Sequence, residues 1–179
     1  YIMQAIPCSD NVCISNGTSI RYAQLYTRRL QHAHYCNRGV SGIDGSTATA
    51  IGISMCFKGR TWLVTGDMSL TYDTGALREV VLNNAHLNII VIANRGGGIF
   101  RYISSSRQLD IRDEMLCHDT ECDFRQLASM YEFKYMKADS LQSLEQNFEY
   151  IINSPQRFLL EIRSDAEYSA RILTDILKS

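Results

Sequence analysis

Short apolar runs alternate with helical patterns along most of this chain. Apolar runs of about four to eight residues, bounded by turn residues, are typical of buried strands. The sequence predicts strands at residues 11–15, 34–36, 61–66, 87–94, 133–136 and 157–163. Apolar side chains at helical spacing predict helices at residues 19–30, 46–57, 72–84, 122–130, 141–152 and 166–178. This alternation predicts an α/β fold, in which helices cover both faces of a mostly parallel sheet and make three layers.

Two of these strands end in oxygen-bearing side chains beside glycine. The run at 61–66 leads into Asp67, and the run at 87–94 ends in Asn94, 27 residues further on. A strand, a helix and a second strand within so short a stretch form a βαβ unit, whose strands are parallel. Ligands of parallel α/β sheets bind beyond the carboxyl ends of the strands, so we expect Asp67 and Asn94 to lie close together.

This pair of side chains suits a Mg²⁺–diphosphate site. Mg²⁺ takes about six oxygen ligands and usually shares them between protein and phosphate. The glycines at 96–98 allow close approach of the backbone, and a helix that begins at Asp67 would offer its N-terminal amides to phosphate. Either half alone is more simply a helix cap or a turn. The two halves together, at this spacing, favour the metal site.

Two further stretches are candidates for ligand contact. Asn16 and Arg21 fall at a junction between a strand and a helix, where α/β proteins place binding groups. On the residues alone, Arg21 is better explained as a solvated helix charge. Glycines at 39, 42 and 45 make a loop that brings backbone close to its neighbours, which is weak evidence for a phosphate cradle. We expect Thr18 or Ser19 to cap the helix at 19–30, and Asp44 to cap the helix at 46–57.

Composition limits the classes of function. At 179 residues, the chain suits one domain, which we place at 11–179, with 1–10 as a linker from an upstream domain. The net charge of −1 gives no electrostatic footprint for nucleic acid. No apolar run approaches the roughly 20 residues that cross a membrane. The six cysteines show no metal-binding spacing that we favour, and we expect reduced thiols in a cytoplasmic protein. The polar stretch 101–121 predicts a long loop of the kind that forms lids.

Four segments resemble thiamine-diphosphate-dependent enzymes. GDMS followed by NRGG resembles the motif usually written GDG…NN, which binds the cofactor. The likeness is stronger to one branch of that family, the SEPHCHC synthases of menaquinone biosynthesis. NRGVSGIDG, GDMSLTYDTGAL, NRGGGIF and SNGTSIR are similar to segments of that branch and occur in the same order. The resemblance covers most of the chain and implies the C-terminal, thiamine-diphosphate-binding domain.

The resemblance also implies roles for matching residues. Asp67, Asn94 and the Gly96 carbonyl would hold Mg²⁺ or Mn²⁺, while Ile43 would support the bent conformation of the cofactor. The cofactor-binding set would be Ile43, Gly66, Asp67, Met68, Ser69, Asn94, Gly96 and Gly97. The substrate carboxylates would be contacted by Asn16, Arg21 and Arg38. Ile99, Phe100 and Ile103 would line the pocket. For Arg21, the resemblance overturns the interpretation as a solvated charge.

The reaction implied is a transfer: 2-oxoglutarate is decarboxylated and its succinyl unit is added to isochorismate. In this family the activating glutamate belongs to a pyrimidine-binding domain on a second subunit of a homodimer or homotetramer. Without that domain, we expect this chain to be inactive and to bind cofactor weakly. Another thiamine-diphosphate lyase or decarboxylase, and a non-catalytic module with the same fold, are the alternatives. Arg95 where Asn is usual, and Gly17 where Ser is expected, depart from the family pattern.

Overall fold

A single parallel sheet forms the centre of the computed structural model, which describes residues 1–27, 32–117 and 121–178. Its six strands lie in the order β2-β1-β3-β4-β6-β5, and every neighbouring pair is parallel. The strands are β1 (Asn11–Ile14), β2 (Ala33–Tyr35), β3 (Thr61–Gly66), β4 (Leu87–Ala93), β5 (Lys134–Ala138) and β6 (Phe158–Arg163). The predicted α/β fold is therefore confirmed, and each predicted strand is present within one or two residues of its expected bounds.

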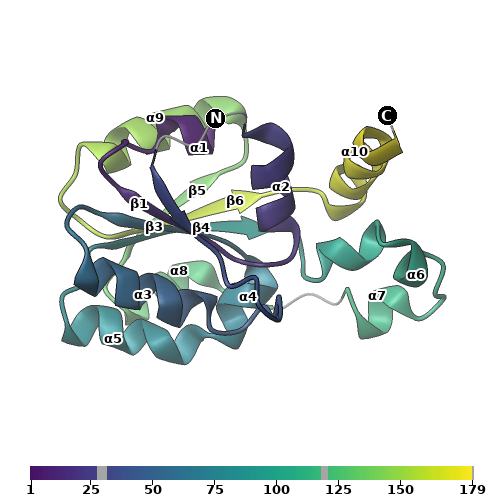
Figure 1. Cartoon of the computed structure of the whole chain (residues 1–179), viewed down its shortest axis with the longest axis horizontal. Helices are drawn as coiled ribbons and strands as arrows, with labels where there is room; N and C mark the ends of the chain where they lie inside the picture. The colour runs from purple at the N-terminus through teal and green to yellow at the C-terminus, as the bar shows by residue number, and fades with distance from the viewer. Residues whose placement is uncertain (28–31, 118–120, 179) are drawn as a thin grey trace.

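Helices cover both faces of this sheet (Figure 1). One face carries α1 (Ile2–Ala5), α2 (Thr18–Tyr26) and α9 (Leu141–Ile152). The other carries α3 (Ser46–Cys56), α4 (Asp67–Tyr72), α5 (Leu77–Leu82) and α8 (Phe124–Met130). Beyond the carboxyl ends of the strands lie η2 (Gly98–Arg101), α6 (Ser104–Arg107), α7 (Arg112–Met115) and α10 (Ala166–Lys178). Strand and helix thus form the three layers that the sequence predicts.

The two faces hold separate hydrophobic clusters. Alternate residues of β3 point to opposite faces, so that Leu63 joins the cluster under α3, α5 and α8. Trp62 and Val64 join the cluster under α1, α2 and α9, where the Trp62 ring stacks on Phe148 at 5.1 Å between centroids. Leu63 and Trp62 have no exposed surface, since the strand is covered on both sides.

The crossover between β3 and β4 differs from the prediction. The sequence predicts one helix over 72–84, but the structure has α4, a 3₁₀ turn η1 (Thr74–Ala76) and α5. The Asp73 carboxylate accepts a hydrogen bond from the Ala48 amide at the start of α3, 3.0 Å away. This contact holds the chain at the break between α4 and η1, so the apolar stripe is divided between two short helices.

Two predicted helix caps are wrong. The N-cap residues of α2 and α3 are Gly17 and Gly45, and neither helix has a side-chain cap. Gly17 and Gly45 have φ angles of 89° and 73°. Glycine adopts such positive φ values readily, whereas the capping residues that we expected do not. By contrast, α9 has a side-chain cap, because the Ser140 hydroxyl accepts a hydrogen bond from the Ser143 amide.

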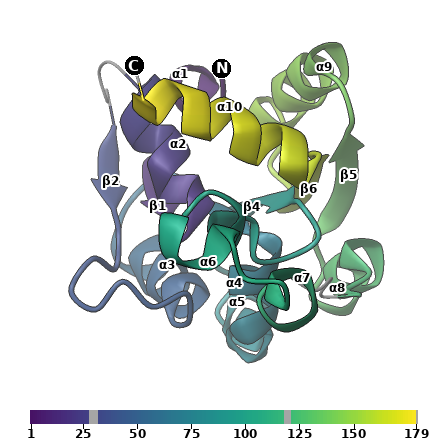
Figure 2. The same cartoon turned by 90° about the vertical axis from the view of Figure 1, so that its right-hand side faces the viewer.

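The ends of the chain pack on the domain. Residues 2–5 form α1, and Ile6 is buried in the core, so part of the segment predicted as a linker packs on the sheet. The domain boundary at residue 11 stays a prediction. Figure 2 shows α10 crossing in front of the carboxyl edge of the sheet, with α6 and α7 beneath it. Within the described residues, no helix is long and apolar enough to span a membrane. All six cysteines are free thiols.

Candidate functional site

The carboxyl ends of β3 and β4 bring the predicted ligand residues together. In the sheet register, Gly66 of β3 lies beside Ile92 of β4. Asp67, the next residue after β3, therefore lies close to the point where β4 ends and Asn94 follows. Asp67 is the first residue of α4, and Asn94 follows the last residue of β4. The predicted meeting of Asp67 and Asn94 at one edge of a parallel sheet is present in the structure.

Asp67 binds the loop after β4 through backbone hydrogen bonds. Its Oδ2 accepts from the amides of Asn94 and Gly96, each at 2.9 Å. Its Oδ1 accepts from the Met68 amide at 2.7 Å. The residue is only 4% exposed, and this burial raises the pKa of the carboxyl while the surrounding backbone amides oppose the rise. A buried carboxylate with unused lone pairs is therefore held at a fixed position.

Asn94 presents a buried amide to the same place. The residue is 7% exposed, and its side chain makes no hydrogen bond within the described part of the chain. The amide is not among the fully buried side-chain groups without a partner, so it opens onto a cavity in which a ligand or water can satisfy it. A Cβ atom at Gly98 would collide with the amide nitrogen of Asn94, so Gly98 must lack a side chain for Asn94 to keep this position.

The backbone of this loop is tightly constrained. Arg95, Gly96 and Gly97 all have positive φ, at 65°, 80° and 55°. A side chain at Gly97 would meet the backbone of Leu116 and Cys117, which folds over the loop. The Cys117 thiol also donates a hydrogen bond to the Gly97 carbonyl at 3.3 Å. The glycine run is thus required both by its left-handed backbone and by close packing.

A cleft of about 330 Å³ opens beside Asp67 and Asn94. The predicted residues that line it are Asn16, Ile43, Gly66, Asp67, Met68, Ser69, Asn94, Gly97, Ile99 and Phe100. The predicted residues that lie outside its lining are Arg21, Arg38, Gly96 and Ile103. Most of the predicted set, drawn from four separate stretches of sequence, therefore surrounds one cavity.

Asn16 connects two walls of the cleft through its side chain. Its Nδ2 donates hydrogen bonds to the carbonyls of Asn37 at 2.7 Å and Gly42 at 2.6 Å. Its Oδ1 accepts from the Arg38 guanidinium at 2.6 Å. Both ends of the amide are therefore occupied by the glycine loop, and Asn16 holds that loop against the end of β1.

The remaining predicted residues have clear positions. Ser69 donates its hydroxyl hydrogen bond to the Ile43 carbonyl at 2.6 Å, so it fixes Ile43 at the cleft. Arg21 is exposed on α2 and donates to Gln24 at 3.2 Å. Burial raises the pKa of Tyr102, and the nearby positive charge of Arg21 opposes that rise. Arg21 and Tyr102 thus lie near each other, and Ile103 follows directly.

The structure adds lining residues that sequence reasoning missed. Thr18, Ser19, Ser41, Gly42 and Ile92 also border the cleft. Gly42 had a signal in the glycine-rich loop, whereas Ile92 is one of several apolar residues of β4 and had none. Among the described residues, no group of three or more His, Cys, Asp or Glu side chains could hold a metal ion. A metal here would need amide and carbonyl oxygens beside Asp67.

Comparisons with known proteins identify the domain. The family model described as thiamine pyrophosphate enzyme, C-terminal TPP binding domain, matches residues 15–162. A 2-succinyl-5-enolpyruvyl-6-hydroxy-3-cyclohexene-1-carboxylate (SEPHCHC) synthase of Flavobacterium psychrophilum is 34% identical over 178 residues, 99% of this chain and 32% of the relative.

The synthase of the same name from Porphyromonas gingivalis is 37% identical over 180 residues, 96% of this chain and 30% of the relative. The chain therefore spans about a third of the length of these curated relatives, which are similar to it along almost all its residues. The resemblance read from the four sequence segments is confirmed. This chain belongs to the thiamine pyrophosphate enzymes, as a C-terminal TPP-binding domain.

Proposed function

We propose that this domain binds thiamine diphosphate through a divalent cation in a transferase that makes SEPHCHC. The observation that carries the proposal is the buried Asp67 carboxylate beside the unpaired Asn94 amide. The names of the similar proteins support a synthase of that product. The proposed reaction is a transfer, in which 2-oxoglutarate is decarboxylated and its succinyl unit is added to isochorismate. Menaquinone biosynthesis is the corresponding pathway, and the cytoplasm is the corresponding compartment.

The donor set fits Mg²⁺ or Mn²⁺. Asp67 offers one carboxylate, Asn94 an amide oxygen and Gly96 a backbone carbonyl, all hard oxygen donors. Three protein ligands leave about three octahedral positions for phosphate oxygens and water. A bound cation would also compensate the burial that raises the pKa of Asp67.

The cleft fits a diphosphate beside that cation. Met68 and Ser69 lie in the first turn of α4, and Gly66 and Gly97 bring backbone to the cleft without side chains in the way. Ile43, held by Ser69, offers an apolar contact to the thiazolium ring. Thiamine diphosphate, when bound, supplies the nucleophilic carbon on which a 2-oxo acid loses carbon dioxide.

The substrates carry carboxylates, and two arginines lie on segments next to the cleft, although neither lines it. Arg38 is held by Asn16, and Arg21 lies on α2 beside Tyr102. Guanidinium groups bind carboxylates through paired hydrogen bonds, which suits both 2-oxoglutarate and isochorismate. Ile99 and Phe100 line the cleft and would exclude water, with Ile103 behind them.

Catalysis would also need a glutamate that activates the cofactor. The activating glutamate would come from a pyrimidine-binding domain of a second subunit, so the working enzyme is a homodimer or homotetramer. On its own, the 179-residue chain is expected to show no turnover of 2-oxoglutarate.

The test uses a protein in which this domain is joined to a pyrimidine-binding domain. Purified with Mg²⁺ and thiamine diphosphate, it should consume 2-oxoglutarate faster when isochorismate is present and form the succinylated product. Asn94→Leu should abolish cofactor binding and turnover, while Gln146→Ala, at an exposed position of α9, should change neither. Consumption of 2-oxoglutarate at the same rate with and without isochorismate would indicate another decarboxylase. Cofactor binding without any turnover would indicate a non-catalytic module.

A further inference from the structure

The loop of residues 37–45 forms one wall of the cleft that would hold the cofactor. Ile43 lines the cleft from this loop, yet it is not among the residues of either hydrophobic cluster. Val40, Gly42 and Asp44 of the same loop are exposed. Packing in the core therefore does not fix the position of Ile43, and the loop depends on its hydrogen bonds.

Two side chains hold the middle of this loop. Asn16 donates a hydrogen bond to the Gly42 carbonyl at 2.6 Å, and Ser69 donates one to the Ile43 carbonyl at 2.6 Å. Asn16 follows β1, and Ser69 lies in the first turn of α4, two residues after Asp67. Neither contact reaches the segment that leads from Ile43 into α3.

Asn37 and Thr49 hold that segment. The Nδ2 atom of Asn37 donates to Oγ1 of Thr49 at 3.0 Å and to the Gly45 carbonyl at 3.3 Å. The Thr49 hydroxyl in turn donates to the Gly45 carbonyl at 2.8 Å. Gly45 is the N-cap of α3, which has no side-chain cap. These two side chains, which we call the Asn37–Thr49 clamp, therefore join the first residue of the loop to its last.

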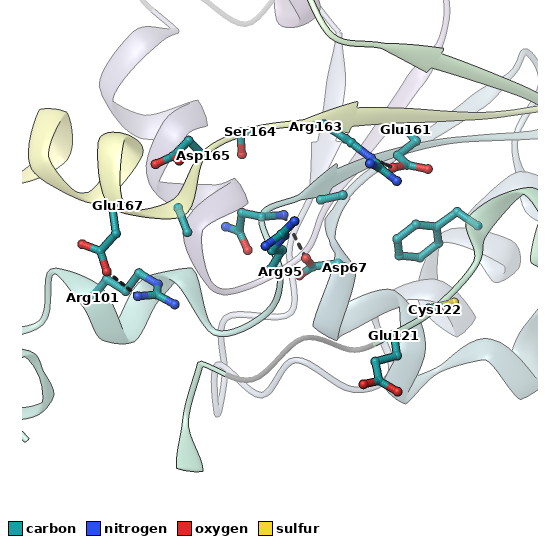
Figure 3. A pocket seen from close by; sticks show the side chains of 14 residues that line it. Asp67, Arg95, Arg101, Glu121, Cys122, Glu161, Arg163, Ser164, Asp165 and Glu167 are labelled. Atoms are coloured by element: carbon teal, nitrogen blue, oxygen red, sulfur yellow. Dashed lines mark hydrogen bonds and ion pairs between the residues drawn. The ribbon is translucent and has the colours of Figure 1, made fainter. Parts of the chain in front are cut away.

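The clamp can act on the cleft without touching a ligand in it. Neither Asn37 nor Thr49 lines the cleft, and both are half-buried. A larger cavity of about 600 Å³ also borders Asp67 and extends toward Ser164 and the start of α10, as Figure 3 shows. None of the described residues that line this larger cavity belongs to the loop. A change in the clamp should therefore alter the cleft alone.

We propose that Asn37 is a positioning residue, which sets the place of Ile43 in the cleft through Thr49 and Gly45. The proposal rests on the proposed function for its purpose, because Ile43 would contact the thiazolium ring of thiamine diphosphate. Without the clamp, water can reach the half-buried groups and the fold remains, but Ile43 is held only from the side of Ser69. A ligand that needs one position of Ile43 then binds less tightly, by the fraction of the molecules in which Ile43 is in place.

The first experiment follows Ile43 without any cofactor. The δ1-methyl signal of Ile43 is recorded by NMR in the 179-residue chain. Asn37→Ala should shift or broaden this signal, and so should Thr49→Val, which removes the hydroxyl at nearly constant shape. The δ1-methyl signal of Ile90, which is fully buried in β4, should stay unchanged because the fold is intact.

Two control variants accompany these changes. Thr49→Ser keeps the hydroxyl and should keep the wild-type signal of Ile43. Asn153→Ala removes a comparable hydrogen bond, from Nδ2 to the Glu149 carbonyl at 2.8 Å, but at the end of α9. It should also leave the signal of Ile43 unchanged. A general loss of stability would instead affect Ile43 and Ile90 alike.

The second experiment measures the binding of thiamine diphosphate with Mg²⁺ by calorimetry, in a protein in which this domain is joined to a pyrimidine-binding domain. Asn37→Ala and Thr49→Val should weaken binding by about three- to tenfold, and tenfold corresponds to about 1.4 kcal/mol. Thr49→Ser and Asn153→Ala should bind like the wild type.

The outcomes separate this proposal from the proposed function. An unchanged Ile43 signal in Asn37→Ala overturns the proposal, and so does a changed signal with unchanged affinity for thiamine diphosphate. A wild type that binds no thiamine diphosphate refutes the proposed function instead. In that case the Ile43 signal alone decides whether Asn37 positions Ile43.

Discussion

Asp67 has two separable roles, and substitutions at this residue can distinguish them. Its carboxylate accepts three backbone hydrogen bonds, from Met68, Asn94 and Gly96. Asp67→Ala leaves three N–H groups without an acceptor, each at a cost of about 1–3 kcal/mol. Because Asp67 borders two cavities, water can reach these groups, so we take the lower figure for each. The expected loss is then about 3 kcal/mol of unfolding free energy.

Asp67→Asn gives a different balance. One amide oxygen can still accept from two N–H groups, so one hydrogen bond is lost, at about 1–2 kcal/mol. The neutral amide also avoids the free-energy cost of burying a charge, which opposes that loss. The same cost raises the pKa of Asp67 in the wild type. The two effects have opposite signs, and we expect Asp67→Asn to lie within about 1 kcal/mol of the wild type near neutral pH.

The pH dependence of the stability difference between the wild type and Asp67→Asn tests whether burial of the charged carboxylate is unfavourable. Since the folded-state pKa of Asp67 is raised, the folded protein holds its proton at pH values where the unfolded chain has lost it. The wild type therefore loses stability relative to Asp67→Asn as the pH rises from about 3.8 through the raised folded pKa. Urea unfolding of both proteins across that range measures the difference. If the wild type instead becomes more stable relative to Asp67→Asn as the pH rises, the hydrogen bonds to the carboxylate outweigh the cost of its burial, and the reasoning is refuted.

Three further predictions concern stability and are read from urea or thermal unfolding. Gly98→Ala should destabilise by about 1–3 kcal/mol, because the added Cβ would collide with the Asn94 amide. Gly52→Ala, at an exposed position of α3, should stabilise by about 1 kcal/mol, and equal effects of the two changes would contradict the packing argument. Arg95→Asn should stabilise the fold by about 1 kcal/mol, because the φ angle of Arg95 is 65° and asparagine tolerates this left-handed backbone better than arginine. A loss of stability would show that the side-chain contacts of Arg95 outweigh its backbone strain. Burial lowers the pKa of His32, so the unfolded state binds a proton first as the pH falls, and the free energy of unfolding should decrease below about pH 6.5. His32→Phe should remove this contribution to the pH dependence of stability, and an unchanged pH dependence would contradict the prediction.

The sequence predicts the central part of the site because its signals are local. Apolar runs identify β3 and β4, and the residue that follows each run is read directly from the chain. Since neighbouring parallel strands end at the same edge, the meeting of Asp67 and Asn94 needs no further information. The same reasoning predicts close approach of backbone at the glycines of 96–98, where the structure has a collision for any side chain at Gly97 or Gly98.

Other features depend on contacts between distant segments and could not be predicted. The role of Asn16 is an example, because its three hydrogen bonds join the end of β1 to a loop more than twenty residues away. The segment 101–121 was predicted as a polar loop, yet its described part forms α6 and α7, tied to α10 by Arg101, Arg112 and Glu167. Surface ion pairs of this kind have no periodic signature. They require knowledge of which helix ends come together.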